Sequence, residues 1–169
     1  KGDYLKDGPI AALETRKKTG WSVTRPTLEQ GNAILKEIDK GLQAGAPGIG
    51  STVGYMRAGV SSREMYEVQK VGARYGRATG AHTRYTLGTD TTENNGAQEL
   101  VANALALGAP AIVLHFNNPG WRLTHEMITR FQEQGHNIWG EVYPYAAGQT
   151  FLNAVFLTPD EWVNRMGHR

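Results

Sequence analysis

The sequence predicts an α/β fold in which about four parallel strands with flanking helices form part of a (β/α)8 TIM-type barrel. Short apolar segments are expected to be strands at residues 48–53, 78–82, 111–115 and 138–142. Stretches whose apolar residues recur at helical spacing separate these segments. Strands that alternate with helices pair in parallel through right-handed crossovers. Because a closed barrel of this class needs eight strands, the chain predicts an incomplete barrel.

Residue types that begin or end helices mark the first two helices. Thr27 is expected to cap a helix that ends at Gly45. Apolar residues recur at every fourth position between them, which is typical of one helix face. Ser61 and Glu64 form a Ser-x-x-Glu capping box, which predicts that a second helix begins there and continues to about Tyr75.

The remaining helices are bounded in the same way. Residues 95–107 are expected to form a third helix, and Thr124 is expected to open a fourth that ends at Gly135. Pro159 and Glu161 predict a final helix, because proline favours the first helical position and the glutamate completes a capping box. Every predicted strand is therefore followed by a helical segment.

Length and composition indicate one globular domain. The chain has 169 residues, of which 40% are hydrophobic and 20% charged, and this is enough to bury a core. Residues 27–169 are expected to form the partial barrel, and residues 1–26 form a segment of unclear structure. The absence of cysteine excludes disulfides and thiolate ligands within the chain.

Charge and hydropathy exclude two classes of partner. The net charge is +2, from 18 basic and 16 acidic residues, which predicts no nucleic-acid partner. No apolar run approaches the ~20 residues of a membrane span. The chain begins at Lys1 without a signal-peptide pattern, so a processed product or a fragment is expected. The compartment stays open, with a bacterial cytoplasm or periplasm favoured.

Two histidines at matching places are the strongest candidates for chemistry. His82 and His115 end two successive predicted strands, one strand–helix unit apart. In a barrel the carboxyl ends of the strands carry the active site, and neutral imidazole is a common zinc ligand. The pattern therefore predicts either of two roles with equal weight. The histidines bind a metal ion, or each one forms hydrogen bonds with backbone groups at the start of a loop.

Polar residues near these strand ends are candidates for substrate binding. Arg84 lies on the same side of its segment as His82 and could bind a carboxylate, or form an ion pair at the barrel rim. Glu141 could orient a ligand histidine, and Tyr143 could donate its hydroxyl to a substrate oxygen, although packing at a rigid strand exit explains both. Asn117 could contact substrate or form a turn.

Other residues of these types are interpreted as structural. The segment 48–54 lacks the Gly-Lys-Ser/Thr of a phosphate loop, so its small residues are expected to allow close approach at the barrel mouth. His125, His136 and His168 fall in or beside predicted helices or turns and are interpreted as surface residues.

At these positions the chain resembles the N-acyl-D-amino-acid deacylases of the amidohydrolase superfamily, and particularly the N-acyl-D-glutamate deacylase-like members. The resemblance extends over residues 26–167. It depends on the order and spacing of five short motifs: Arg25-Pro26-Thr27, residues 45–52, His82-Thr83-Arg84, His115 and residues 143–150.

The resemblance implies a metal-dependent (β/α)8 barrel, with a small β-domain built from the chain ends, that hydrolyses the amide of N-acyl-D-amino acids. His82 and His115 match the two mid-barrel histidines that ligate one or two zinc ions, and Tyr143 matches a tyrosine that contacts the substrate carboxylate. Asn117 replaces a lysine that grips the α-carboxylate, and Glu141 replaces an aspartate. The family's His-x-His strand, metal-bridging cysteine and catalytic aspartate have no counterpart here, so the isolated chain is expected to be inactive.

The expected partners follow from an incomplete barrel. Exposed sheet edges favour association with the remainder of a barrel or with further copies of the chain. A small N-acyl amino acid is the expected substrate. Two alternatives remain: a non-catalytic βα-repeat module that binds a small carboxylated ligand without metal, and a barrel fragment whose only role is to bind a complementary chain.

Overall fold

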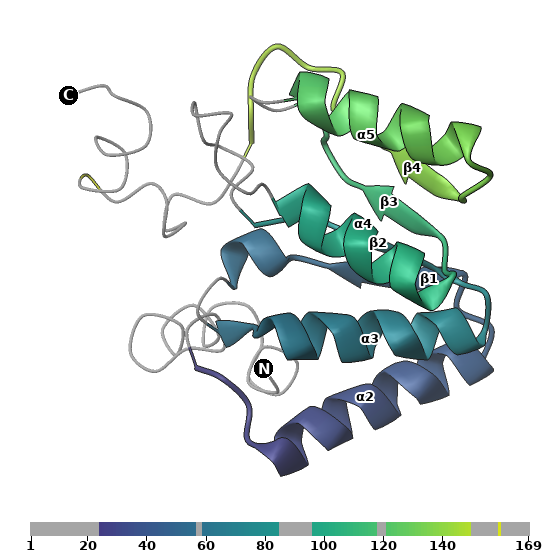
Figure 1. Ribbon diagram of the computed structural model, residues 1–169. Helices are drawn as coiled ribbons and strands as arrows, with labels where there is room; N and C mark the ends of the chain where they lie inside the picture. Colours follow the sequence, from purple (N-terminus) through teal and green to yellow (C-terminus); the bar gives the residue numbers. More distant parts are fainter. Residues whose placement is uncertain (1–23, 57–58, 85–95, 118–120, 150–158, 160–169) are drawn as a thin grey trace.

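The computed structural model describes residues 24–56, 59–84, 96–117, 121–149 and 159. Within these ranges helices and strands alternate along the chain (Figure 1). The strands are β1 (Gly48–Ser51), β2 (Ala78–Ala81), β3 (Ala111–Val113) and β4 (Ile138–Gly140). The helices are α2 (Leu28–Gln43), α3 (Ser62–Arg74), α4 (Gly96–Leu107) and α5 (Trp121–Glu133), with the 3-10 turn η1 at Val53–Tyr55.

The strands form one parallel sheet in the order β1-β2-β3-β4, which confirms the predicted α/β architecture. The last rung of the sheet joins one residue of each strand: Ser51, Ala81, Val113 and Gly140. The predicted strands are one or two residues too long at this end, because pairing with the neighbouring strand stops at that rung. The candidate residues therefore begin the loops beyond the sheet.

Two helices begin where the sequence predicts. The hydroxyl of Thr27 accepts a hydrogen bond from the Gln30 N–H at 3.2 Å, and the Gln30 side chain accepts one from the Thr27 N–H at 2.9 Å. The hydroxyl of Ser61 accepts from the Glu64 N–H at 3.1 Å. These side chains satisfy N–H groups that the first turn of a helix leaves without intrahelical partners.

The other predicted helix boundaries differ in part. Helix α4 is described from Gly96, since the predicted first residue, Asn95, lies outside the described residues, and it ends at Leu107 as predicted. The predicted start at Thr124 is wrong, because α5 already begins at Trp121 and Thr124 is buried within its first turns. A threonine that caps a helix stands outside it, with extended backbone. The predicted final helix, apart from Pro159, lies outside the described residues, as does most of the segment 1–26.

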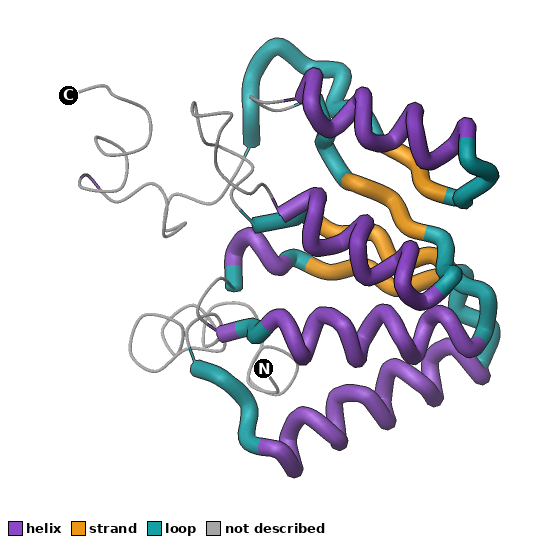
Figure 2. The backbone as a smooth tube through the Cα atoms, in the orientation of Figure 1, coloured by secondary structure: helices purple, strands orange, loops and turns teal. Residues whose placement is uncertain are grey.

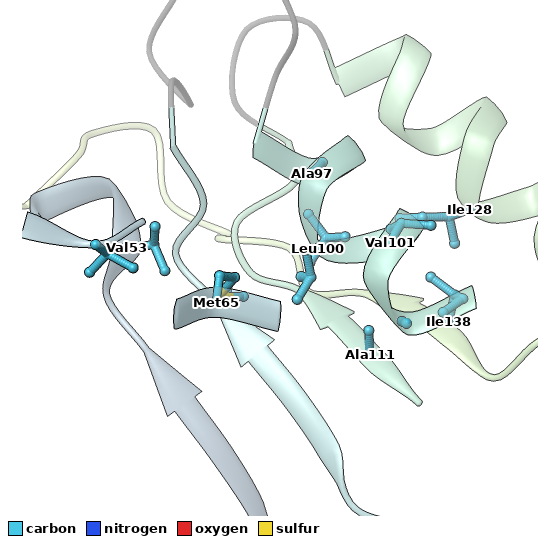
Figure 3. Packing of buried hydrophobic residues seen from close by; sticks show 12 residues of the cluster. Val53, Met65, Ala97, Leu100, Val101, Ala111, Ile128 and Ile138 are labelled. Carbon is cyan, nitrogen blue, oxygen red and sulfur yellow. The ribbon is translucent and has the colours of Figure 1, made fainter. Parts of the chain in front are cut away.

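The core lies between the sheet and the helices. Figure 2 shows the helices on one side of the strands, and burial alternates along β3 accordingly. Figure 3 shows Leu100 and Val101 of α4 packed near Ala111 and Ile138 of the sheet. Leu100 is fully buried. This core fixes the helices against the strands and thereby fixes the edge at which the candidate site lies.

The opposite face of the sheet is more exposed. Trp139 of β4 is 58% exposed, and its indole N–H donates to the side chain of Asn137 at 2.6 Å. Within the described residues, β1 and β4 are the outer strands of the sheet. A sheet that, within the described residues, ends at two outer strands and has a partly exposed face is what an incomplete barrel predicts. No helix in the described part of the chain is both long and apolar enough to cross a membrane.

Substitutions on the two faces of the sheet should differ strongly in cost. Leu100→Ala removes a fully buried side chain and is expected to lower the free energy of unfolding by about 2–5 kcal/mol. Trp139→Ala is expected to cost less than about 1 kcal/mol, because an exposed side chain loses little packing. Denaturant unfolding of the 169-residue chain measures both. A cost for Trp139→Ala equal to that of Leu100→Ala would show that Trp139 is covered.

Candidate metal centre

The two predicted histidines lie together at the carboxyl edge of the sheet. The ring centroids of His82 and His115 are 5.0 Å apart, with 56° between the ring planes. The backbone N–H of His82 donates to the Ser51 carbonyl at 2.9 Å, so a bond beyond the last rung of the sheet ties His82 to the end of β1. Two imidazoles from neighbouring strand ends can therefore face one small ligand.

The turn η1 packs against His82. The Tyr55 ring stacks on the His82 ring, with centroids 4.7 Å apart and planes 26° apart. The Gly54 N–H donates to the His82 carbonyl at 2.9 Å. A Cβ atom on Gly54 would lie 2.5 Å from Cδ2 of His82 and 2.6 Å from the carbonyl oxygen of Thr83. Only glycine leaves room for this ring, which confirms the predicted close approach.

Tyr55 is a site residue that the sequence reasoning missed. The one signal for it was its position directly after Gly54, at the end of a segment already predicted to lie at the barrel mouth. An aromatic residue next to such a glycine can cover a functional side chain, but the same pattern is equally typical of core packing. Its stacking partner His82 is distant in sequence, and therefore the contact depends on the fold.

His115 has an unusual backbone conformation that Glu141 supports. Its φ of 48° lies in the left-handed region, which costs a non-glycine residue about 1–2 kcal/mol. The Oε2 atom of Glu141 accepts a hydrogen bond from the His115 backbone N–H at 2.8 Å and lies 3.1 Å from Nδ1 of the ring. One carboxylate oxygen therefore holds both the backbone and the ring of His115. A proton on Nδ1 leaves the lone pair of Nε2 for a cation.

The loops after β3 and β4 run side by side. The Glu141 N–H donates to the Val113 carbonyl at 2.9 Å, and the Phe116 N–H donates to the Glu141 carbonyl at 3.0 Å. The side chain of Asn117 forms two hydrogen bonds with the backbone of Tyr143, each of 2.8 Å. These bonds bring the four predicted residues of this part of the site, His115 included, into one cluster.

Tyr143 presents its ring to His115. Their centroids are 6.3 Å apart, with 82° between the planes, which is an edge-to-face arrangement. The Tyr145 ring also contacts the Tyr143 ring, with centroids 5.0 Å apart and 64° between the planes. Tyr143 is therefore next to the histidine pair, as its predicted role in substrate binding requires.

Arg84 is engaged in an ion pair. Its Nε donates to Oε2 of Glu99 at 2.6 Å, and its Nη2 donates to Oε1 of the same carboxylate at 3.4 Å. The two side chains are only 12% and 17% exposed, so the pair is largely shielded from water. The geometry matches the predicted ion pair at the barrel rim. Contact of Arg84 with a substrate carboxylate stays a prediction.

Burial keeps His82 uncharged at neutral pH. Desolvation of the ring, with repulsion from His115 as the smaller cause, lowers the pKa of His82 from its ordinary value of 6.5 to about 4. A neutral imidazole has a lone pair available for a metal ion, whereas an imidazolium does not. The environment of His82 therefore suits a metal ligand over the whole neutral range.

The donor set fits part of a zinc site. It consists of a neutral imidazole, a second imidazole 5.0 Å away and a carboxylate that orients the second ring. A catalytic zinc ion takes three protein ligands as a rule. Among the residues that the structure describes, no group of three or more histidine, cysteine, aspartate or glutamate residues is arranged to hold a metal. The described chain can thus supply two ligands.

The remaining histidines do not join this cluster as far as they are described. His125 and His136 are exposed, as predicted. The rings of Phe116 and Trp121 contact His125, and that of Phe131 contacts His136. His168 lies outside the described residues. The interpretation of His125 and His136 as surface residues is confirmed.

Comparison with known proteins supports this interpretation of the fold. No protein-family model and no curated sequence matches the chain. A solved N-acyl-D-glutamate deacylase from Bordetella bronchiseptica, complexed with zinc and a phosphonate inhibitor that mimics the reaction tetrahedral intermediate, is similar with a TM-score of 0.63 and 24% identity; the match covers 73% of this chain and 27% of that chain. A D-aminoacylase described as defining a novel subset of amidohydrolases has a TM-score of 0.60 and 23% identity. The match covers 74% of this chain and 27% of that chain.

A third solved structure extends the likeness beyond the deacylases. L-hydantoinase (dihydropyrimidinase) from Arthrobacter aurescens has a TM-score of 0.53 and 26% identity, and the match covers 80% of this chain and 36% of that chain. The likeness concerns the fold: the chain has an α/β fold like part of the TIM barrel of these solved amidohydrolases. Its structural neighbours include N-acyl-D-glutamate deacylase and D-aminoacylase, and it spans about a quarter of their length.

Gly54→Ala is expected to displace the His82 ring, because the added Cβ would meet both the ring and the backbone of Thr83. The nuclear Overhauser effect between the Tyr55 and His82 rings should disappear. Gly50→Ala is the matched control, since a Cβ there meets nothing within 4 Å. If the two variants gave the same nuclear Overhauser effects at the His82 ring, the close approach of Gly54 to His82 would be contradicted.

The metal-free chain should lose stability as the pH falls from about 6.5 to about 4, because the unfolded state binds a proton at His82 that the folded state excludes. His82→Asn is expected to remove this part of the pH dependence. The free energy of unfolding of both proteins, measured across this range, checks the prediction. The prediction would be contradicted if the free energies of unfolding of the two proteins differed by the same amount at every pH.

Proposed function

We propose that this chain contributes to the active site of a metal-dependent amidohydrolase that hydrolyses the amide bond of N-acyl-D-amino acids, with N-acyl-D-glutamate as a candidate substrate. The observation that carries the proposal is the meeting of two imidazoles at the carboxyl edge of the sheet, with Glu141 on Nδ1 of His115. The zinc-containing deacylase among the structural neighbours supports both the metal and the substrate class.

In this proposal His82 and His115 hold the metal. A zinc ion bound there supplies a Lewis acid and lowers the pKa of a bound water to about 7. Burial keeps His82 neutral, so no proton has to leave it at neutral pH. Glu141 accepts a hydrogen bond from the Nδ1 proton and so directs Nε2 of His115 away from the carboxylate.

The substrate would be oriented by the aromatic side of the cluster. Tyr143 lies edge-to-face with His115, and its hydroxyl is the candidate donor to a substrate carboxylate or carbonyl oxygen. Arg84 and Asn117 are weaker candidates, because Arg84 would have to leave Glu99 and both polar groups of the Asn117 side chain are engaged with Tyr143.

Hydrolysis also needs a group that accepts the proton of the attacking water and gives it to the leaving nitrogen. Among the described carboxylates, Glu141 is bound to His115, and Glu99 is paired with Arg84. We therefore assign the general base to residues outside the described part, in the remainder of the barrel. On this assignment the isolated chain binds metal but hydrolyses little or no substrate.

Zinc binding tests the proposal directly. We expect the purified chain to bind zinc in near-stoichiometric amount, as measured by elemental analysis and calorimetry. His82→Ala combined with His115→Ala should abolish binding because both nitrogen ligands are lost. Glu141→Gln should weaken binding about 10- to 100-fold, which is typical when the partner of a ligand histidine is removed.

His136→Ala is the matched control, since His136 is exposed and outside the cluster. It should bind zinc like the unchanged chain, and circular dichroism should show that all variants fold. Zinc that persists in the double variant would place the metal elsewhere. A folded chain that takes up no zinc would contradict the proposed metal centre.

A further inference from the structure

The side chain of Asn117 forms an unusual contact with a single residue. Its Nδ2 donates to the Tyr143 carbonyl at 2.8 Å, and its Oδ1 accepts from the Tyr143 N–H at 2.8 Å. A carboxamide has the same donor and acceptor as a peptide group, so it can pair with a backbone as a neighbouring strand does. Asn117 is exposed, yet both of its polar groups are satisfied by one partner.

This contact lies at the end of a series of bonds between two loops. The series continues from the sheet through Glu141 with Val113, and then through Phe116 with Glu141. The Asn117 pair with Tyr143 comes next in both loops. Beyond Gly140 the backbone of β4 is no longer part of the sheet, so these bonds carry the alignment of the two loops outward.

The alignment matters because Tyr143 stands beside the metal-binding candidates. Its ring is edge-on to His115 at 6.3 Å. Glu141 fixes the His115 side of that contact through the His115 backbone and ring. The position of the Tyr143 ring in that contact depends on the Tyr143 backbone. The Asn117 side chain holds this backbone by both the N–H and the carbonyl of Tyr143.

We propose that Asn117 is a positioning residue, whose amide clamps the backbone of Tyr143 and so holds the Tyr143 ring edge-on to His115. The effect of this positioning on substrate orientation rests on the function proposed above, whereas the hydrogen-bonded clamp itself does not. Asn117 thus acts through Tyr143 rather than by touching substrate. Glu141 fixes the histidine, and Asn117 fixes the tyrosine.

The test is the nuclear Overhauser effect between the ring protons of Tyr143 and His115 in the 169-residue chain. Asn117→Ala should abolish this signal because both bonds are lost, while the signal between His82 and His115 and the zinc affinity stay unchanged. Tyr143→Phe should retain the ring contact, since the clamp holds the backbone. A Tyr143–His115 signal of full strength in Asn117→Ala overturns the proposal.

Two further variants keep the test decisive. Asn137→Ala is the matched control, because Asn137 flanks the other end of β4 and its side chain accepts a bond from the Trp139 indole; it should leave the Tyr143–His115 signal intact. Asn117→Asp keeps the size and the acceptor but opposes a carboxylate oxygen to the Tyr143 carbonyl, so the signal should weaken. If Asn117→Ala fails to fold, an undiminished signal in Asn117→Asp overturns the clamp.

The outcome separates the two proposals. Zinc uptake by the unchanged chain depends on His82 and His115 and tests the metal centre. The ring–ring signal depends on Asn117 and is measured without zinc. If the unchanged chain binds no zinc but Asn117→Ala loses the ring–ring signal, the clamp is supported and the proposed function is rejected. If the unchanged chain binds zinc but Asn117→Ala keeps the signal, the function is supported and the clamp is rejected.

Discussion

The parallel pairing of four short strands in register determines where the helices pack and where the candidate site lies. One rung joins the last residues of all four strands: Ser51, Ala81, Val113 and Gly140. The next residues along β2 and β4 are His82 and Glu141, and His115 follows β3 after one intervening residue. Register alone therefore gathers side chains that are far apart in sequence, and the helices packed on one face keep the strands in that register.

Beyond the sheet, side chains replace strand pairing as the source of order. Glu141 holds the left-handed backbone of His115 by its N–H and its ring at once. Asn117 pairs with Tyr143 as a strand would. Strained backbone is retained at functional sites where neighbouring groups fix it. The sheet and its core bring the two loops together, and these side-chain contacts between the loops then pre-organise the cluster.

The sequence was most informative where structure is decided locally. Helix starts at Thr27 and Ser61 were predictable because the capping side chain lies within three residues of its partner. The ends of the strands were less predictable, because a strand ends where its pairing with a neighbouring strand stops. The histidine pair was predictable from matching strand ends. The identity of Glu99 as the ion-pair partner of Arg84 and the stacking of Tyr55 on His82 were not, since each contact joins residues that only the fold brings together.

We propose that His82 and His115 bind one metal ion through their ring nitrogens. X-ray absorption spectroscopy of the zinc-loaded chain measures this most directly, because it reports the ligand type and distance at the metal. We expect two imidazole nitrogens at about 2.0–2.1 Å from zinc, and we expect both to disappear from the spectrum when the two histidines are replaced by alanine. If zinc has oxygen ligands only, or if the replacement leaves its ligands unchanged, the two histidines do not bind the metal.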